Sequence, residues 1–235
     1  VLKQATNLGI PIHLHLHETK KEVETGLMAD GRRPYTRVKE LGLLKADLQT
    51  IHMTELNDEE IESLYKNQIH VVHCPESNMK LASGICPVNE LIGNGVNVAL
   101  GTDGAASNND LDLLAEARSA AFLSKVTSGC PSSVKAEEAL SMATINGARL
   151  LGLDKRIGSL EIGKCADIIA VDLSGISFQP IYNPISQLIY AASGQDVTHT
   201  WINGECLYKD KRYTKLNLAQ LKGRVESWQK KIRRS

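Results

Sequence analysis

The feature that most constrains the fold is an alternation of short apolar runs with stretches of helical character over the first hundred residues. Four apolar runs have the length of buried strands: residues 10–16, 48–53, 69–72 and 96–100. Four stretches have helical character: residues 18–25, 35–44, 58–67 and 88–92. We expect Asp58 to be the N-cap of the third stretch. Strands that alternate with helices predict an α/β fold with a parallel sheet and crossover helices.

Polar residues gather at the carboxyl ends of these runs. The residues concerned are His15, His17 and Glu18, then His52, then His73, Glu76, Ser77 and Asn78, and finally Asp103, Ser107, Asn108 and Asn109. In parallel α/β barrels the active site is built from the carboxyl ends of the strands and the loops beyond them. We therefore expect these side chains to meet at one site.

The first run, "PIHLHLHET" at residues 11–19, has three histidines at alternate positions before an acid. Residues two apart in a strand share a face, so His13, His15 and His17 are predicted to lie on one side, with Glu18 at the end. Imidazole groups suit a transition metal, and a nearby carboxylic acid suits proton transfer. From this stretch alone, a metal site and a polar strand end without metal remain equal alternatives.

Several of these residues also have a simpler explanation. Asp103 could cap the helix that follows, although residues 108–110 stand closer to that helix and could cap it instead. Ser107 could be a turn residue, and we favour a substrate contact. His70 and His73 are three positions apart, so at most one of them can point into a shared site. We take His73 as the second candidate substrate contact.

The balance of charge argues against several classes of partner. The 235 residues include 27 basic and 27 acidic side chains, and a net charge of zero argues against a nucleic acid or an anionic membrane. No apolar run approaches the length that crosses a bilayer. The five cysteines are widely spaced and lack a C-x-x-C pair, which argues against a disulfide framework and a thiolate zinc site. We therefore expect a cytoplasmic protein in which nitrogen and oxygen ligands hold any metal.

The chain changes character near residue 152. The predicted sheet and a zone of long helices come before this point, and glycine-punctuated turns with an apolar strand come after it. Residues 197–208 have the pattern of a hairpin around an Asn203-Gly204 turn. We therefore divide the chain into three parts: residues 1–152, a β unit at 153–214 and a helix at 215–235.

The last part contains "LNLAQLKGRVESWQKKIRR", which has the period of an amphipathic helix. Its apolar residues at helical spacing are Leu218, Leu221, Val225, Trp228 and Ile232. A helix with one apolar face normally buries that face, so we expect this helix to dock on the body of the protein. Its basic end offsets the helix dipole.

Four segments together resemble one enzyme family. "HLHE", "IHMT", "VHCPESNMKLASGICPV" and "VALGTDGAASNND" are similar to the C-terminal half of an amidohydrolase-superfamily enzyme. More narrowly, they resemble the 5-methylthioadenosine/S-adenosylhomocysteine deaminases, which are grouped with the triazine hydrolases. The resemblance covers essentially the whole chain, including "GSLEIGKCADIIAVD". It implies the C-terminal half of a TIM-like (β/α)8 metallo-hydrolase barrel, followed by part of a small β-sandwich and a C-terminal helix.

The resemblance also implies a role for each motif residue. His15 would be a metal ligand, and Glu18 would be the acid/base. His52 would orient or polarise the attacking water, while Asp103 would be the carboxylate on the metal and would accept the proton of that water. The implied metal is one Zn²⁺ per subunit, with another divalent metal such as Fe²⁺ as the alternative. The other two histidines of the first run are expected to pack around the site.

The implied reaction is hydrolytic deamination of an adenine nucleoside, 5-methylthioadenosine or S-adenosylhomocysteine, with release of ammonia. A guanine deaminase or a triazine-type hydrolase with the same metal chemistry is the alternative among enzymes. A catalytically inactive scaffold is the alternative of another class, and the presence of His15, Glu18, His52 and Asp103 together argues against it. We expect a homo-oligomer whose partner is a small nucleoside.

One part of the family pattern is missing. Such enzymes take two further metal histidines from an H-x-H on the first barrel strand, and no such element lies upstream of residue 10. Four strands are also half of an eight-stranded barrel and expose two unpaired edges. We therefore expect the chain to be the C-terminal portion of a longer polypeptide and to require the N-terminal half of the barrel.

Overall fold

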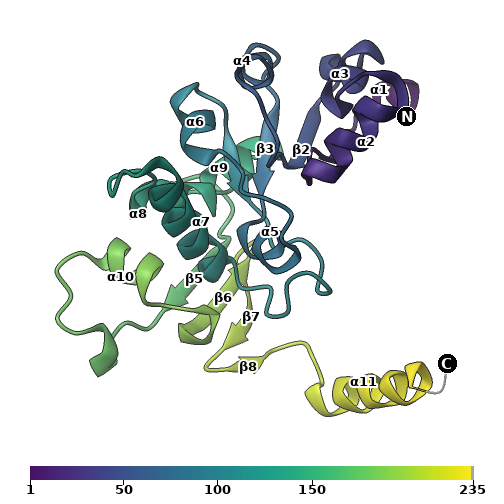
Figure 1. Ribbon diagram of the computed structural model, residues 1–235. Coiled ribbons are helices and arrows are strands. Elements are labelled where there is room, and N and C mark those ends of the chain that lie inside the picture. The colour runs from purple at the N-terminus through teal and green to yellow at the C-terminus, as the bar shows by residue number, and fades with distance from the viewer. Residues whose placement is uncertain (234–235) are drawn as a thin grey trace.

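A four-stranded parallel sheet organises the computed structural model, which describes residues 1–233 (Figure 1). Its strands are β1 (Ile12–Leu16), β2 (Leu48–His52), β3 (His70–His73) and β4 (Val98–Leu100). Neighbouring strands pair in parallel, in the order β1-β2-β3-β4. The four predicted strands and the predicted α/β fold class are confirmed.

Helices precede and connect these strands. They are α1 (Leu2–Leu8), α2 (Lys20–Asp30), α3 (Pro34–Glu40), the 3-10 helix η1 (Leu43–Lys45), α4 (Asp58–Lys66), α5 (Pro75–Leu81) and α6 (Val88–Gly93). The prediction that Asp58 caps α4 is wrong by one residue. Asn57 is the N-cap, because its side chain accepts the N–H of Glu60 while the Glu60 carboxylate accepts the N–H of Asn57.

A second group of helices follows β4. They are α7 (Leu113–Ser128), α8 (Ala136–Met142), α9 (Ile145–Leu150) and, further along the chain, α10 (Pro184–Tyr190). Asp112 caps α7 in place of the predicted residues 108–110, and its side chain accepts the N–H of Leu114. The helix starts this late because Leu111 has a left-handed backbone with φ +54°.

The two faces of the parallel sheet carry two separate groups of buried side chains. Successive strand residues point to opposite faces. Leu48 and Val71 pack against the helices in the larger cluster. The smaller cluster consists of Ile51, Val72, Cys74, Ala99 and Leu150. Because Ile51 and Val72 alternate with residues of the larger cluster, the smaller one lies on the opposite face of the sheet.

An antiparallel sheet forms a second layer of structure. Its strands are β5 (Ile168–Val171), β6 (Val197–Ile202), β7 (Glu205–Lys209) and β8 (Arg212–Tyr213), and the 3-10 helices η2 (Ile176–Phe178) and η3 (Gly194–Asp196) lie between β5 and β6. The predicted hairpin joins β6 to β7 through Asn203 and Gly204, which both have positive φ. An Asn-Gly pair is the preferred sequence for such a turn.

The predicted docking of the last helix, α11 (Leu218–Ile232), is wrong for the described part of the chain. Leu221, Val225 and Trp228 are 45–60% exposed, and α11 buries none of its residues. In Figure 1 the helix extends away from both sheets. The amphipathic pattern predicts the helix correctly, but it carries no information on which surface covers the apolar face.

The division of the chain at residues 152 and 214 stays a prediction. Ile189 of α10, which falls within 153–214, is fully buried in the larger cluster beside the parallel sheet. The Arg118 side chain of α7 donates to the carbonyl oxygens of Ile189 and Ala192. Within residues 1–233, no helix is long and apolar enough to cross a membrane.

Candidate active site

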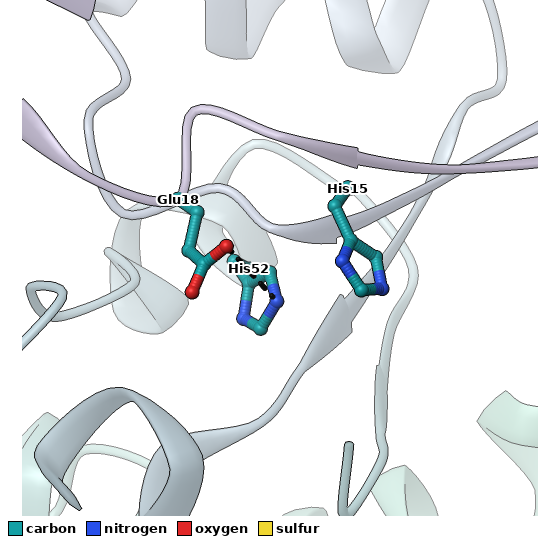
Figure 2. Close-up of side chains that lie close together, drawn as sticks. All are labelled: His15, Glu18 and His52. Atoms are coloured by element: carbon teal, nitrogen blue, oxygen red, sulfur yellow. Dashed lines mark ion pairs between the residues drawn. The ribbon is translucent and has the colours of Figure 1, made fainter. Parts of the chain in front are cut away.

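Three of the predicted site residues meet at the carboxyl ends of β1 and β2. Each of His15, Glu18 and His52 offers a ligand atom, and these atoms all lie within 4.8 Å of one another (Figure 2). Glu18 Oε2 lies 3.8 Å from His52 Nε2, and the Glu18 Oε1 atom accepts a hydrogen bond of 3.2 Å from Ser83. The alternation of the first strand and its closing acid therefore produce the expected cluster.

His15 reaches the cluster through strand alternation, and His52 reaches it through a break in that alternation. Leu16 packs in the larger cluster, so His15 points to the opposite face, which Ile51 shares. Strict alternation would turn His52 away from that face. His52 instead has a left-handed backbone with φ +75°, and its ring lies 4.9 Å from the ring of His15.

Asn78 fixes the protonation of the His52 ring. Its Oδ1 atom lies 2.8 Å from His52 Nδ1 inside the protein. An amide oxygen only accepts hydrogen bonds, so in this contact Nδ1 carries a proton. In the tautomer with its single proton on Nδ1, Nε2 has a lone pair on the side of Glu18 and can accept a hydrogen bond from a water molecule.

Asp103 is held beside the cluster by two serines. Ser77 and Ser107 donate hydrogen bonds of 2.7 and 2.6 Å to Asp103 Oδ2. Burial acts to raise the pKa of the Asp103 carboxyl, but the serine hydrogen bonds, the Gly104 amide and His52 together lower it. Asp103 is therefore a carboxylate whose charge interacts with His52, although it is not among the three residues whose ligand atoms lie within 4.8 Å.

The two candidate substrate contacts stay predictions. Ser107 gives its hydroxyl proton to Asp103, so it can only accept a hydrogen bond from a substrate. His73 is fully buried at the end of β3, and neither ring nitrogen has a hydrogen-bond partner within residues 1–233. Burial, aided by nearby His52, lowers the pKa of His73 to about 3, so the ring is neutral.

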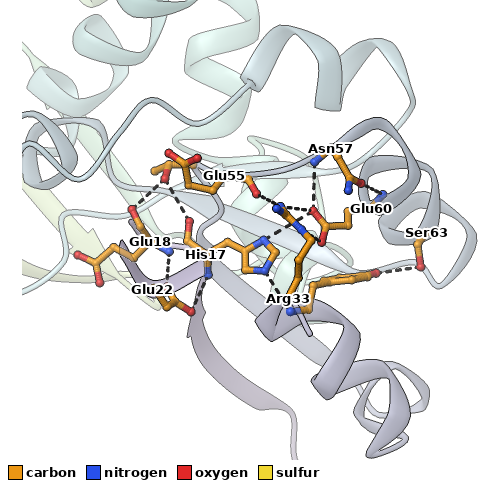
Figure 3. A network of polar contacts seen from close by, with 10 residues as sticks. His17, Glu18, Glu22, Arg33, Glu55, Asn57, Glu60 and Ser63 are labelled. Carbon is orange, nitrogen blue, oxygen red and sulfur yellow. Dashed lines mark hydrogen bonds and ion pairs between the residues drawn. The ribbon is translucent and has the colours of Figure 1, made fainter. Parts of the chain in front are cut away.

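The other two histidines of the first run lie outside the cluster. His17 is fully buried on the far side of the strand end, where its Nε2 atom accepts the N–H of Tyr35 at 3.0 Å and Nδ1 lies 3.7 Å from Glu60 (Figure 3). Burial lowers the pKa of His17 and outweighs the opposite effect of Glu60. His13 pairs with Gln49 at 3.1 Å. The prediction that His13, His15 and His17 lie on one side is therefore wrong for His17, because its left-handed backbone with φ +50° takes the ring out of the alternation of the strand.

A buried carboxylate that the sequence did not indicate supports the Asp103 loop. Glu116 of α7 is fully buried, accepts the N–H of Glu76 at 3.1 Å and accepts the side-chain amide of Asn108. These two partners directly neighbour Ser77 and Ser107 in the chain. Burial raises the pKa of Glu116 to about 7. One carboxylate therefore ties together the segments that hold both Asp103 donors.

The family follows from a direct comparison. A profile described as the amidohydrolase family matches residues 1–207. The chain belongs to the amidohydrolase family. A 5-methylthioadenosine/S-adenosylhomocysteine deaminase from Teredinibacter turnerae is 45% identical over 228 residues, which are 97% of this amidohydrolase chain and 52% of that protein. The resemblance predicted from the four motifs is thus confirmed.

Solved structures share the fold. A crystal structure described as an adenosine deaminase from Xanthomonas campestris with bound zinc has a TM-score of 0.97 and 44% identity, and the match covers 100% of this chain and 54% of that one. An atrazine chlorohydrolase from Arthrobacter aurescens has a TM-score of 0.88 at 24% identity, over 96% and 50% of the two chains, and this likeness concerns the fold alone. The chain spans about half the length of the curated relatives it matches.

The donor set of this amidohydrolase chain fits a zinc ion. Two imidazoles and a carboxylate with ligand atoms within 4.8 Å of one another supply the nitrogen and oxygen ligands that catalytic zinc sites use. Ligands about 2.1 Å from one ion lie no more than roughly 4.2 Å apart, so the side chains need only small movements to share an ion. Asp103, a carboxylate whose charge interacts with His52, would add a fourth ligand atom, which is the second oxygen of the set.

Sequence reasoning identified the titratable groups and placed Ser77 and Asn78 at the same edge of the sheet, but it gave these two residues no role. Both lie in "CPESN", a segment singled out by the resemblance. Glu116 gave no signal, because an acid in the first turn of a helix normally interacts with the helix dipole on the surface.

Proposed function

We propose that the polypeptide containing this chain is a zinc-dependent hydrolase that deaminates an adenine nucleoside, 5-methylthioadenosine or S-adenosylhomocysteine, and releases ammonia. The observation that carries the proposal is the cluster of His15, Glu18 and His52 at adjacent strand ends. Relatives that are 44–45% identical and bear the 5-methylthioadenosine/S-adenosylhomocysteine deaminase name support the substrate class. The adenosine deaminase of known structure supports it further.

His15 and Asp103 are the ligands that this chain would contribute to the metal, one Zn²⁺ per subunit or another divalent ion such as Fe²⁺. A bound zinc ion supplies Lewis-acid activation of water at neutral pH. Its remaining ligands would come from the part of the barrel that the matched relatives have and this chain does not match.

The side chains of this chain then move protons. His52 Nε2 accepts a hydrogen bond from the attacking water, because its Nδ1 proton is engaged by Asn78. Asp103 takes a proton from that water as its oxygen bonds to C6 of the adenine ring. Glu18 delivers a proton to the ring nitrogen, regains one from the new C6 hydroxyl group and passes it to the departing amine, so the C6–N bond breaks and ammonia leaves. The proton held by Asp103 then returns to Glu18, which restores both carboxyl groups for the next turnover.

The assembly around this site is part of the proposal. Strands β1 and β4 are the two edges of the parallel sheet within residues 1–233. We infer that further strands close this sheet into a barrel, in the same polypeptide or as a bound fragment. We also retain the cytoplasmic location and the homo-oligomer expected from the sequence and its family.

The test compares substrates on one preparation. We define the complete enzyme as residues 1–235 joined to, or co-expressed with, the half of the Teredinibacter turnerae deaminase that this chain does not match. Ammonia release is measured with 5-methylthioadenosine, S-adenosylhomocysteine, guanine and a chlorinated triazine. We expect the two adenine nucleosides to have the highest kcat/KM. A much higher kcat/KM for guanine or the triazine would contradict the proposed substrate but not the proposed zinc-dependent hydrolysis. No turnover of any compound would favour an inactive scaffold.

A further inference from the structure

The dipeptide His17–Glu18 leaves strand β1 in a backbone conformation that needs external support. His17 has φ +50°, in the left-handed region that residues other than glycine rarely adopt. Such a conformation persists only where the surroundings hold it, and it is often found at functional sites. The direction of the Glu18 side chain depends on this turn, because Glu18 is the next residue.

Glu22 holds the two amide groups of this dipeptide. Its Oε1 atom accepts the N–H of His17 at 3.1 Å, and its Oε2 atom accepts the N–H of Glu18 at 2.7 Å (Figure 3). Glu22 itself is fixed at the start of α2, where its own N–H donates to the Thr19 hydroxyl at 3.1 Å. A carboxylate at this end of a helix is also stabilised by the helix dipole.

Thr54 holds the two carbonyl groups of the same dipeptide. Its hydroxyl lies 3.1 Å from the His17 oxygen and 2.8 Å from the Glu18 oxygen, and its N–H donates to the His17 oxygen at 2.9 Å. The hydroxyl is packed tightly, because a Cβ atom at Gly84 would come within 2.8 Å of it. Thr54 is therefore fixed in place beyond the end of strand β2.

We propose that Glu22 and Thr54 are positioning residues for the reaction, which clamp all four backbone polar groups of His17–Glu18 and so aim the Glu18 carboxylate at His15 and His52. This inference rests on the proposed role of Glu18 as the acid/base. The contacts converge on the two residues that set the direction of Glu18, and Ser83 adds a bond to its carboxylate. Displacement of a catalytic group by about 1 Å is enough to lower turnover by about a hundredfold.

The variants are chosen so that the chemical change is small. Glu22→Gln keeps the shape but leaves one oxygen for two N–H groups, and Thr54→Val removes the hydroxyl alone. Thr54→Ser keeps the hydroxyl and is the rescue variant.

Thr50→Val is the matched control for Thr54, because the buried Thr50 hydroxyl donates to the His70 carbonyl in the same sheet, away from Glu18. Glu138→Gln is the matched control for Glu22, since Glu138 accepts one backbone N–H at the start of α8.

All variants are measured as the complete enzyme with 5-methylthioadenosine. We expect Glu22→Gln and Thr54→Val to lower kcat by about 10- to 100-fold, with KM and zinc content near those of the parent. Thr54→Ser should recover most of the lost kcat, and both controls should leave kcat nearly unchanged. Unchanged kcat in Thr54→Val, or a loss in Thr50→Val of the same size, would overturn the inference. If Glu22→Gln does not fold, the three threonine variants still decide it.

A double-mutant cycle separates positioning of Glu18 from general destabilisation. Residues that act as a unit have strongly non-additive effects on turnover. In a Glu18→Gln background, Glu22→Gln and Thr54→Val should therefore lower kcat no further. Equal losses in both backgrounds would overturn the positioning role and leave the proposed function intact. Near-normal turnover of Glu18→Gln alone would instead overturn the proposed function, and the role of the clamp with it.

Discussion

His15 and His17 are two residues apart at the end of strand β1, yet their side chains lie in different surroundings. His15 lies on the open face with Glu18 and His52, whereas the His17 ring is buried against the Tyr35 amide and Glu60. Alternation alone would place both rings on one face of the strand, so the left-handed turn at His17 is what separates a ligand position from a packing position.

We therefore expect zinc content to discriminate among these positions. In the complete enzyme, His15→Ala and Asp103→Ala should each lower the bound zinc, because both side chains are proposed ligands. His17→Phe should retain zinc, although it leaves the Tyr35 N–H without an acceptor and so destabilises the fold by about 1–3 kcal/mol. Metal analysis of the purified variants is the measurement. Zinc lost from the His17 variant and kept in the His15 variant would reverse the assignment.

At the residue scale, the types of side chain in the site could be predicted from their chemistry. The positions that depend on an unusual backbone conformation could not be predicted. Alternation and the closing acid predict that His15 and Glu18 share a site. His52 was assigned to the site from its motif, whereas strand alternation alone would place its side chain on the opposite face of the sheet. Its left-handed backbone conformation directs the side chain to the face that holds His15. Asn78 contacts His52 through one neutral hydrogen bond, and Thr54 contacts the His17–Glu18 backbone through its hydroxyl and its N–H. The role of such uncharged side chains cannot be recognised from a pattern in the sequence.

At the scale of elements, Glu116 joins α7 to the beginning of α5 and to the loop that carries Asp103. It reaches both through hydrogen bonds to Glu76 and Asn108. Among the groups around it, the charges of Glu76 and Asp110 add to the effect of burial and raise its pKa, while the hydrogen bonds that it accepts oppose them. The net result is a pKa of about 7 for Glu116, well above the ordinary value of 4.5.

This pKa predicts a pH dependence with a definite sign. Because the folded state holds the proton of Glu116 more tightly than the unfolded state, its contribution to stability is complete below pH 4.5 and is lost as the pH rises through about 7. The loss amounts to at most roughly 3 kcal/mol. Glu116→Gln has no proton to lose, so its stability relative to the parent should improve from pH 5 to pH 8. Urea midpoints of the complete enzyme at both pH values measure this, and a constant difference would contradict it.

The predictions of helices and strands are correct where they depend on a local sequence pattern. They are wrong where the position of an element depends on contacts with another part of the structure. The four strands and the Asn203-Gly204 hairpin depend on short apolar runs and on turn chemistry. The start of α7 moved to Asp112, because the turn at Leu111 is set by a hydrogen bond from its N–H to Asn108, five residues after Asp103. The exposed face of α11 shows that an amphipathic period does not specify its docking site.

At the scale of the whole molecule, both sheets are open. The parallel sheet has β1 and β4 as its edges within the described residues, and no residue of strands β5 to β8 is fully buried. A sheet is stable when its apolar face is covered by another layer. The half-length match to the relatives agrees with the half barrel expected from counting strands.

The most direct test is the zinc stoichiometry and ammonia release of residues 1–235 alone, compared with the complete enzyme. Catalytic zinc sites have at least three protein ligands. In the proposed mechanism Glu18 and His52 act on the substrate and the water rather than on the metal, so this chain supplies only His15 and Asp103 as ligands. We expect the chain alone to be poorly soluble, to bind zinc weakly and to release no ammonia from 5-methylthioadenosine. The complete enzyme should hold one zinc per chain and turn over. One tightly bound zinc with turnover in the chain alone would contradict the half-barrel interpretation and would mean that its own residues complete the site.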